Sequence, residues 1–452
     1  MLVGEDDIAG VAIPLEVRIP SGYPYVPPKV RPVDGSGGAG WHQERDGSLC
    51  LWDAERAQPD WWTSRDAVVE RVRDWFHQAA NGWRDDAPDM DLDRYWPQSQ
   101  GLVLYDELPT FGWVRLSGGP SPRHVCPVWN VKGNGSSSKR GRAAGYVISI
   151  GEPDRPPRSL PELLLLVDGD DLDAALDKQQ VGWLIVRYQR HGVGGVLALR
   201  LTYDTTGVTG CTAVSTASAA RSARQLRAGV EARELASASV AVVGAGAIGS
   251  FVADLLARSG VLHFSIIDSD ILKPGNLVRH VLGDGGVGEP KATALRQQLA
   301  DRHGVSAAHM TAACERIDDL AAAVELLASH DLVVNATGGV AVTVALDHAA
   351  EILDKPVVTV ATTQEGRVIR VDCSPRRQGE VWLDDPALPP TGLPPLLEDG
   401  CGSPISPTPP WAVTLAASYA ARTVVCLLTG QPAPVSYVQT VSVGVPPEAA
   451  TC

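Results

Sequence analysis

The feature that most constrains the fold is a short apolar run followed by closely spaced glycines. Residues 239–243 are small or β-branched, the run Gly244-Ala245-Gly246-Ala247-Ile248-Gly249 follows directly, and an apolar helical pattern continues through Leu256. This order predicts a strand, a glycine turn and a helix. Glycines let the backbone approach a phosphate while the helix N-terminus faces the anion. We therefore expect Gly244, Gly246 and Gly249 to form a phosphate-binding turn in an α/β domain.

Polar residues after this turn decide between two kinds of nucleotide enzyme. The next predicted strand, residues 264–267, ends at Asp268, whose carboxylate can hold a ribose hydroxyl, and on this much an NAD-dependent dehydrogenase is an equally good interpretation. Asn276, Arg279 and Lys291 separate the two, because a dehydrogenase has no need of them. An enzyme that adenylates a carboxylate does need cationic neighbours, since three phosphates and a developing charge at the α-phosphorus must be stabilised.

These motifs resemble those of the ThiF, MoeB and ubiquitin-activating superfamily over about residues 216–440. The resemblance implies a Rossmann-like fold, ATP and Mg²⁺ as cofactors, and adenylation of a protein's C-terminal carboxylate. It places the phosphates at the three glycines, the ribose at Asp268 and the phosphate chain at Asn276, Arg279 and Lys291.

The magnesium site departs from the family's pattern. The family usually places a magnesium-binding Asp after the strand that spans residues 331–334 of this chain, but Gly338 stands at that position. Asp270 is therefore the expected magnesium ligand, with Asn335 or water as alternatives. An inactive adenylation site is the other interpretation of Gly338.

Two further residues are assigned by the resemblance. Arg224 lies in an Arg-x-x-Arg-Gln run that resembles the family's helix reaching into the partner protomer's site, so we expect it to act in trans within a homodimer. Cys401 lies in a proline-rich loop before the helical stretch 411–428, where the family carries the cysteine that takes the acyl group from AMP. A flexible loop suits a residue that must reach the nucleotide. Cys373 is the rival, but it ends an alternating strand and is interpreted as structural.

A second motif lies near the start of the chain, in the order Tyr23-Pro24-Tyr25-Val26-Pro27-Pro28, His42, Asp46-Gly47-Ser48-Leu49-Cys50-Leu51 and Trp61-Trp62. The prolines hold an extended turn and Asp-Gly supplies a tight turn before the thiol. This order resembles the ubiquitin-conjugating fold and implies that Cys50 accepts and donates an acyl group, because a thiolate exchanges thioesters readily. Gln and Glu follow His42 in place of the family's oxyanion-stabilising Asn, so the oxyanion donor is unassigned.

Length and spacing indicate three regions of one α/β chain. At 452 residues the chain is too long for one ordinary core. We predict a truncated ubiquitin-conjugating-like α+β domain at 1–100, a linker or small α/β middle domain at 101–215, and a ThiF-type adenylation domain at 216–452. The middle region is assigned only from its apolar runs, which predict strands.

Charge and hydropathy exclude some partners. The net charge of −14 and pI near 5.2 argue against a nucleic acid as the main partner. No apolar run approaches the ~20 residues of a membrane-spanning helix, so no membrane partner is expected. Two catalytic thiols are consistent with a reducing cytoplasm.

The combination of the two motifs resembles bacterial enzymes that fuse conjugating and activating domains, as in CBASS antiphage operons. It implies that MgATP activates the C-terminal carboxylate of a ubiquitin-like protein, that Cys401 captures it as a thioester, and that Cys50 passes it to an amine of a target protein. Two alternatives stay open. One is a ThiF-like enzyme that activates a sulfur carrier, and the other is an inactive scaffold that binds a ubiquitin-like protein.

Overall fold

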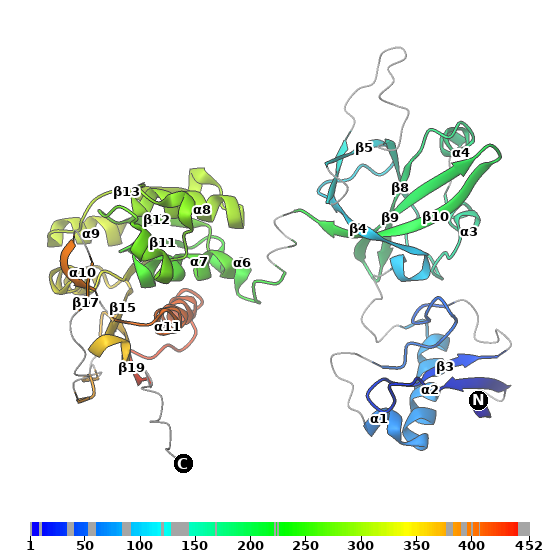
Figure 1. Cartoon of the computed structure of the whole chain (residues 1–452), viewed down its shortest axis with the longest axis horizontal. Helices are drawn as coiled ribbons and strands as arrows, with labels where there is room; N and C mark the ends of the chain where they lie inside the picture. Colours follow the sequence, from blue (N-terminus) through cyan, green and yellow to red (C-terminus); the bar gives the residue numbers. More distant parts are fainter. Residues whose placement is uncertain are drawn as a thin grey trace, which may run out of the picture. The chain divides into compact units, whose positions relative to one another are not determined.

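The chain divides into two compact units, residues 1–220 and 221–452 (Figure 1). The finer boundary expected near residue 100 stays a prediction. The computed structural model describes residues 2–8, 11–33, 40–52, 60–83, 92–118, 122–127, 144–167, 170–220, 223, 226–376, 383–389, 396–398, 401–405 and 407–441.

The first unit opens with an antiparallel sheet whose strands follow the order β1-β2-β3. Val30 and Pro32 of β3 are buried on one side of this sheet, which gives the alternation of a half-buried strand. Helix α2 begins at the N-cap Ser64, whose side chain accepts a hydrogen bond from the Ala67 amide. The elements are β1 (Leu2–Ile8), β2 (Val11–Arg18), β3 (Lys29–Pro32), α1 (Asp60–Thr63), α2 (Arg65–Ala80) and the 3₁₀ helix η1 (Leu92–Tyr95).

The middle of the chain forms a closed barrel, in the strand order β10-β4-β6-β5-β7-β8-β9. The apolar runs at residues 102–105, 146–150 and 183–186, which the sequence predicts as strands, coincide with β4, β7 and β8, except that Ile150 lies just beyond β7. The two ends of this order meet because β10 pairs antiparallel with β9, which closes the barrel. Two of the pairings within it, β10 with β4 and β7 with β8, are parallel. Its elements are β4 (Gln98–Tyr105), β5 (Gly112–Gly118), β6 (Arg123–Pro127), β7 (Ala144–Ser149), α3 (Leu160–Leu164), α4 (Asp170–Asp177), β8 (Trp183–Arg190), β9 (Val193–Asp204) and β10 (Gly207–Ser218).

The second unit is built on a twisted sheet in the order β13-β12-β11-β14-β15-β16-β19. Strands β13 to β15 of this order run parallel, and β16 and β19 add antiparallel at one edge. This is the Rossmann-like α/β fold expected from the sequence. Its strands are β11 (Ser239–Val243), β12 (His263–Ile267), β13 (Met310–Ala313), β14 (Leu332–Asn335), β15 (Val357–Thr363), β16 (Val368–Ser374) and β19 (Ser436–Thr440), with a separate hairpin of β17 (Leu396–Glu398) and β18 (Cys401–Ile405).

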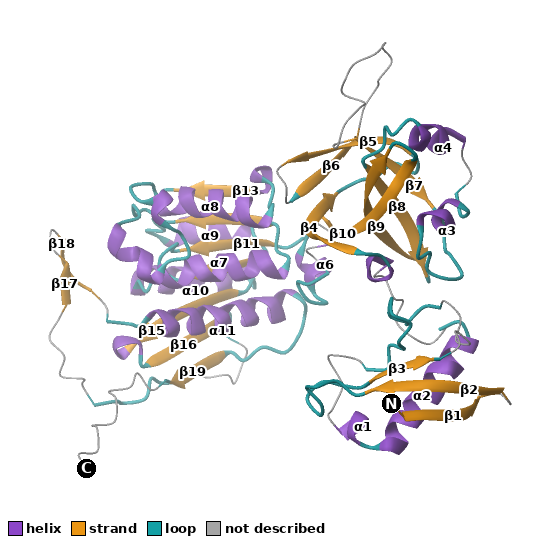
Figure 2. Ribbon diagram, turned by 45° about the vertical axis from the view of Figure 1, so that its right-hand side comes forward, coloured by secondary structure: helices purple, strands orange, loops and turns teal. Residues whose placement is uncertain are grey.

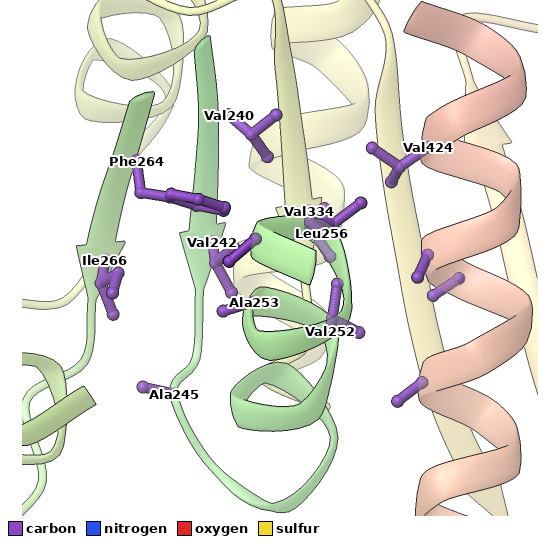
Figure 3. Packing of buried hydrophobic residues seen from close by; sticks show 14 of the residues in the cluster. Val240, Val242, Ala245, Val252, Ala253, Leu256, Phe264, Ile266, Val334 and Val424 are labelled. Atoms are coloured by element: carbon purple, nitrogen blue, oxygen red, sulfur yellow. The ribbon is translucent and has the colours of Figure 1, made fainter. Parts of the chain in front are cut away.

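Helices cover both faces of this sheet (Figure 2). Val240 and Val242 of β11 enter the core beneath α7, α8 and α11, whereas Ala241 and Val243 enter the core beneath α9 and α10. Figure 3 shows Val242 and Phe264 against Val252 and Leu256 on the first face. The helices are α6 (Ala232–Leu235), α7 (Ala247–Ser259), α8 (Lys291–His303), α9 (Leu320–Ala328), α10 (Val340–Leu353) and α11 (Pro410–Leu428), with 3₁₀ turns η3 (Pro274–Arg279), η4 (Asp284–Gly286), η5 (Ala307–His309) and η6 (Gln364–Gly366).

The expectation that no apolar run approaches the length of a membrane-spanning helix is wrong, because α11 has 19 residues and, alone among the helices of the described residues, is long and apolar enough to cross a membrane. Its small residues lie against the sheet, and Ala416, Ala420 and Val424 have no exposed surface. This burial is that of a core helix.

Candidate nucleotide site and thiol sites

The glycine turn joins β11 to α7 at the carboxyl end of the sheet. Gly244 has a φ of 90°, a left-handed conformation that favours glycine, and its amide donates to the Ile267 carbonyl at 2.8 Å. Gly246 is the N-cap of α7 and provides no side-chain cap. A Cβ at Gly246 would meet no heavy atom within 4 Å. The start of α7 therefore has no side-chain cap, and helix starts of this kind are suited to binding an anion.

Two carboxylates from the end of β12 border this turn. Asp268 accepts a hydrogen bond from the Ala245 amide at 2.7 Å, and its other oxygen accepts from the Asp270 amide at 2.8 Å. Asp270 forms an ion pair with Lys291, with 2.9 Å between Oδ2 and Nζ. Lys291 is buried at the first position of α8, where the helix dipole disfavours a cation. Such a local conflict is typical of a functional position.

His280, which the sequence did not indicate as a site residue, connects the glycine turn to these groups. Its Nε2 lies 2.7 Å from the Ala245 carbonyl, and its Nδ1 accepts the Leu282 amide at 3.2 Å. Because Nδ1 is an acceptor, Nε2 carries the proton and donates to Ala245. Burial lowers the pKa of His280, the bond to Ala245 and the charge of Asp268 oppose this shift, and Lys291 adds to it. A neutral histidine thus supports the glycine turn. Its only sequence signal is its place beside Arg279.

The remaining two predicted phosphate ligands lie on η3. Asn276 uses its side-chain oxygen to accept the Lys273 amide at 3.0 Å, which caps the start of η3. Arg279 donates to the Thr408 carbonyl at 3.3 Å. The structure therefore connects Asp268 to the glycine turn through the Ala245 amide and to Lys291 through Asp270. Asn276 and Arg279 lie on the segment that leads into His280.

Comparison with known proteins identifies this unit, because residues 221–439 match the ThiF family. The C-terminal unit is a ThiF domain. Over 115 residues the chain is 36% identical to the ATP-dependent ubiquitin transferase-like protein Cap2 of Enterobacter hormaechei, which covers 25% of this chain and 19% of Cap2. Over 158 residues it is 34% identical to the sulfur carrier protein adenylyltransferase of Thermus thermophilus, which covers 34% of this chain and 56% of that protein. The chain thus spans less than two thirds of these curated relatives.

A crystal structure of Escherichia coli MccB is also similar. The similar region covers 47% of this chain and 61% of MccB, with 17% sequence identity and a TM-score of 0.37.

Gly338, Asn335 and Asp270 are the positions considered for magnesium from the sequence. Gly338 has a φ of 67°, a conformation that favours glycine. Asn335 is buried, and both ends of its side-chain amide form hydrogen bonds within the protein. The nitrogen donates to Thr343 at 2.9 Å, and the oxygen accepts from Thr337 at 2.8 Å. In the described part of the chain, no group of three His, Cys, Asp or Glu side chains could hold a metal ion. Asp270 remains the candidate ligand on the protein side.

Two cysteines and one arginine complete the residues considered from the sequence in the ThiF domain. Cys401 is the first residue of β18 and pairs with Glu398 of β17. Its role as the acyl acceptor stays a prediction. Arg224 lies outside the described residues. The rival Cys373 is buried in β16 and its thiol donates to the Pro434 carbonyl at 3.4 Å, which fits a structural role.

In the first unit, Cys50 ends a tight hairpin. Gln43 and Leu49 form an antiparallel bridge, and the Cys50 amide donates to the His42 carbonyl at 2.8 Å. The turn is held by Asp46. Burial would raise the pKa of Asp46, but hydrogen bonds from Ser48 and Lys29 outweigh this and lower it to about 2. The turn carboxylate is therefore ionised at neutral pH.

The hairpin is fixed against a segment that follows β7. Trp41 donates from Nε1 to the Asp154 carbonyl at 3.1 Å, and Arg158 donates to the Gln43 side-chain oxygen at 3.1 Å. The guanidinium of Arg190 lies 3.8 Å from the centre of a Trp41 ring. Cys50 is half-buried, a position from which a thiol can still be reached.

Proposed function

We propose that the ThiF domain uses MgATP to adenylate the C-terminal carboxylate of a ubiquitin-like protein. The match of residues 221–439 to the ThiF family carries this proposal. Two relatives support it by their names, one an adenylyltransferase that acts on a sulfur carrier protein and one a ubiquitin transferase-like protein. The open space at Gly246 and the uncapped start of α7 fit a bound phosphate.

The chemistry needs positive charge near the α-phosphorus. A carboxylate oxygen attacks this phosphorus, the bond to the bridging oxygen breaks, and pyrophosphate leaves. Lys291 and Arg279 supply the charge that stabilises the developing anion. Asp268 holds the ribose, the turn at Gly244 and Gly246 holds phosphate oxygens, and Mg²⁺ enters as part of the nucleotide substrate with Asp270 as its protein ligand.

The acyl group then moves through two thiols. The thiolate of Cys401 attacks the carbonyl carbon of the adenylate and AMP leaves. The thiolate of Cys50 takes the acyl group from Cys401, and a target amine takes it from Cys50. The ubiquitin-conjugating-like interpretation of the first unit, the trans action of Arg224 in a homodimer, a cytoplasmic location and a role in antiphage defence complete the proposal.

Exchange of labelled pyrophosphate into ATP tests the adenylation step. The assay uses the full chain with a small ubiquitin-like protein encoded beside it. We expect exchange in the wild type, and a loss of roughly a hundredfold in Lys291→Ala, because a charge that stabilises the transition state is removed. Lys273→Ala is the control for loss of a lysine charge, since Lys273 is exposed just before η3.

The exchange assay distinguishes a wrongly assigned site from an inactive adenylation domain. Equal exchange in Lys291→Ala and wild type would contradict the assigned site. No exchange with any carboxylate partner would favour the inactive scaffold.

A further inference from the structure

The sulfur of Cys50 lies between two side chains of opposite charge. The Cys50 thiol donates to the Glu44 carboxylate, with 3.5 Å from Sγ to Oε1. The Arg94 guanidinium donates to the same sulfur, with 3.7 Å from Nη1 to Sγ. An acid and a base thus contact the atom that would carry the acyl group.

Each flanking residue is held by a different element. Glu44 is fixed in the hairpin turn, where its amide donates to the Ser48 carbonyl at 2.6 Å and its carbonyl accepts the Gly47 amide at 2.9 Å. Arg94 belongs to η1, whose other side chains Leu92 and Tyr95 are 1% exposed and pack in one core with Leu197 and Leu199 of β9. The barrel therefore fixes the backbone from which Arg94 reaches the sulfur.

Other polar groups of the hairpin point to different partners. Gln43 is buried, donates to the Gly47 carbonyl at 3.1 Å and accepts from Arg158. The His42 ring packs against Trp83 in a tilted arrangement, with 4.2 Å between ring centres. Gln43 and His42 are thus engaged in packing and hydrogen bonds of the loop.

We propose that Arg94 and Glu44 are catalytic residues of Cys50, with Arg94 stabilising negative charge on the sulfur and Glu44 accepting the proton of the attacking amine. This inference rests on the proposed role of Cys50 as an acyl carrier. In the step, the amine nitrogen bonds to the carbonyl carbon of the thioester, and the carbon–sulfur bond breaks. The sulfur leaves as a thiolate beside Arg94, and the ammonium proton passes to Glu44. The same contact favours the Cys50 thiolate when it attacks an incoming thioester.

Alkylation of Cys50 tests the charge effect without ATP or a partner protein. The rate at which iodoacetamide labels Cys50 is followed against pH by peptide mass analysis. An opposite charge within about 4–6 Å favours the ionised form by one unit or more, so we expect Arg94→Ala to label about tenfold more slowly at pH 7. Relative to wild type, the rise of the alkylation rate with pH should occur at higher pH in Arg94→Ala and at lower pH in Glu44→Gln.

The control variants distinguish the effect of charge on the Cys50 sulfur from changes in the accessibility of Cys50 or in folding. Arg94→Lys keeps the charge and should restore most of the wild-type profile. Arg65→Ala and Glu70→Gln change exposed charges on α2 and should leave the profile unchanged. Circular dichroism checks that each variant is folded. If the midpoint of the alkylation rate against pH were the same in Arg94→Ala, Glu44→Gln and wild type, the proposal would be overturned. A shift of this midpoint in the same direction in both variants would also overturn it.

A second experiment tests whether Glu44 accepts the proton of the attacking amine. Once Cys50 carries a thioester, Glu44→Gln should slow its discharge to a primary amine about tenfold or more, but leave discharge to a small thiol at pH 9 unchanged, because a thiolate brings no proton to remove. Equal slowing of both reactions would show that Glu44 only shapes the loop. Failure to form any thioester on wild-type protein would contradict the acyl-carrier role itself, whereas the alkylation profiles would still decide the roles of the flanking charges.

Discussion

At the residue scale, the three glycines around the start of α7 meet different constraints. Gly244 needs its left-handed φ, and a Cβ on Gly249 would approach the Gly244 carbonyl oxygen to 1.8 Å. Gly246 has neither restriction, since its φ is −82° and its Cβ direction is open. Packing within the domain therefore does not require a glycine at this position, which is why we assign Gly246 to ligand binding.

A valine at position 246 separates these roles. We expect Gly246→Val to keep the wild-type melting temperature within about 2 °C, because the side chain enters open space, and to lose at least about tenfold in ATP affinity, because the methyl groups occupy the phosphate position. Isothermal titration with ATP measures the affinity. Gly283→Val is the control, since that exposed loop glycine also has open space. Unchanged affinity in Gly246→Val would contradict the assignment of the turn.

His280 gives the nucleotide site a pH dependence. Its lowered pKa means that the folded protein disfavours the charged ring, so the stability it contributes is complete above its ordinary pKa of about 6.5 and falls as pH falls below that value. Protonation of Nδ1 would also remove the bond from the Leu282 amide and place a cation near Lys291. We therefore expect the ThiF domain to lose thermal stability as the pH falls below about 6.5. His280→Gln, whose amide can both donate and accept, should reduce this loss. An equal loss in that variant would exclude His280 as the cause.

At the scale of elements, α7 depends on its close approach to the strand layer. Gly249 lets the helix lie against Gly244 and Ala336, and overpacking at such a contact costs roughly 1–3 kcal/mol or more. We expect Gly249→Ala to lower the calorimetric transition of the ThiF domain by roughly 4–8 °C. Gly246→Ala, made one turn earlier, should leave that transition unchanged. Equal transitions in Gly249→Ala and wild type would show that the helix does not pack as described.

The same elements show what sequence could predict. β11, α7 and β12 have local signals, namely an apolar run, a glycine turn and helical periodicity, and the structure confirmed them within a few residues. The barrel has no such signal, because β10 pairs with β4 across about a hundred residues of chain. Spatial neighbours in the sites were missed for the same reason. Arg94 lies 44 residues from Cys50 in the sequence, and a contact of this kind is set by the packing of η1 on the barrel.

For the whole molecule, we propose a relay in which each unit supplies one thiol. The ThiF domain contains Cys401 and the nucleotide turn, and the first unit contains Cys50 with its charged neighbours. A chain that carries both thiols replaces a diffusional encounter by an effective concentration. Each thiol can be removed separately, so the order of the two steps is open to direct observation.

Intact-mass analysis without reductant tests this claim most directly. The full chain is co-expressed with proteins encoded beside it, as wild type, Cys50→Ala and Cys401→Ala, and Cys314→Ala serves as the control for an exposed thiol. The account predicts a thiol-labile adduct on Cys50 in the wild type, its loss in Cys401→Ala, and an adduct retained on Cys401 in Cys50→Ala. An adduct on Cys50 that persists without Cys401, or no adduct in any form of the protein, would contradict it.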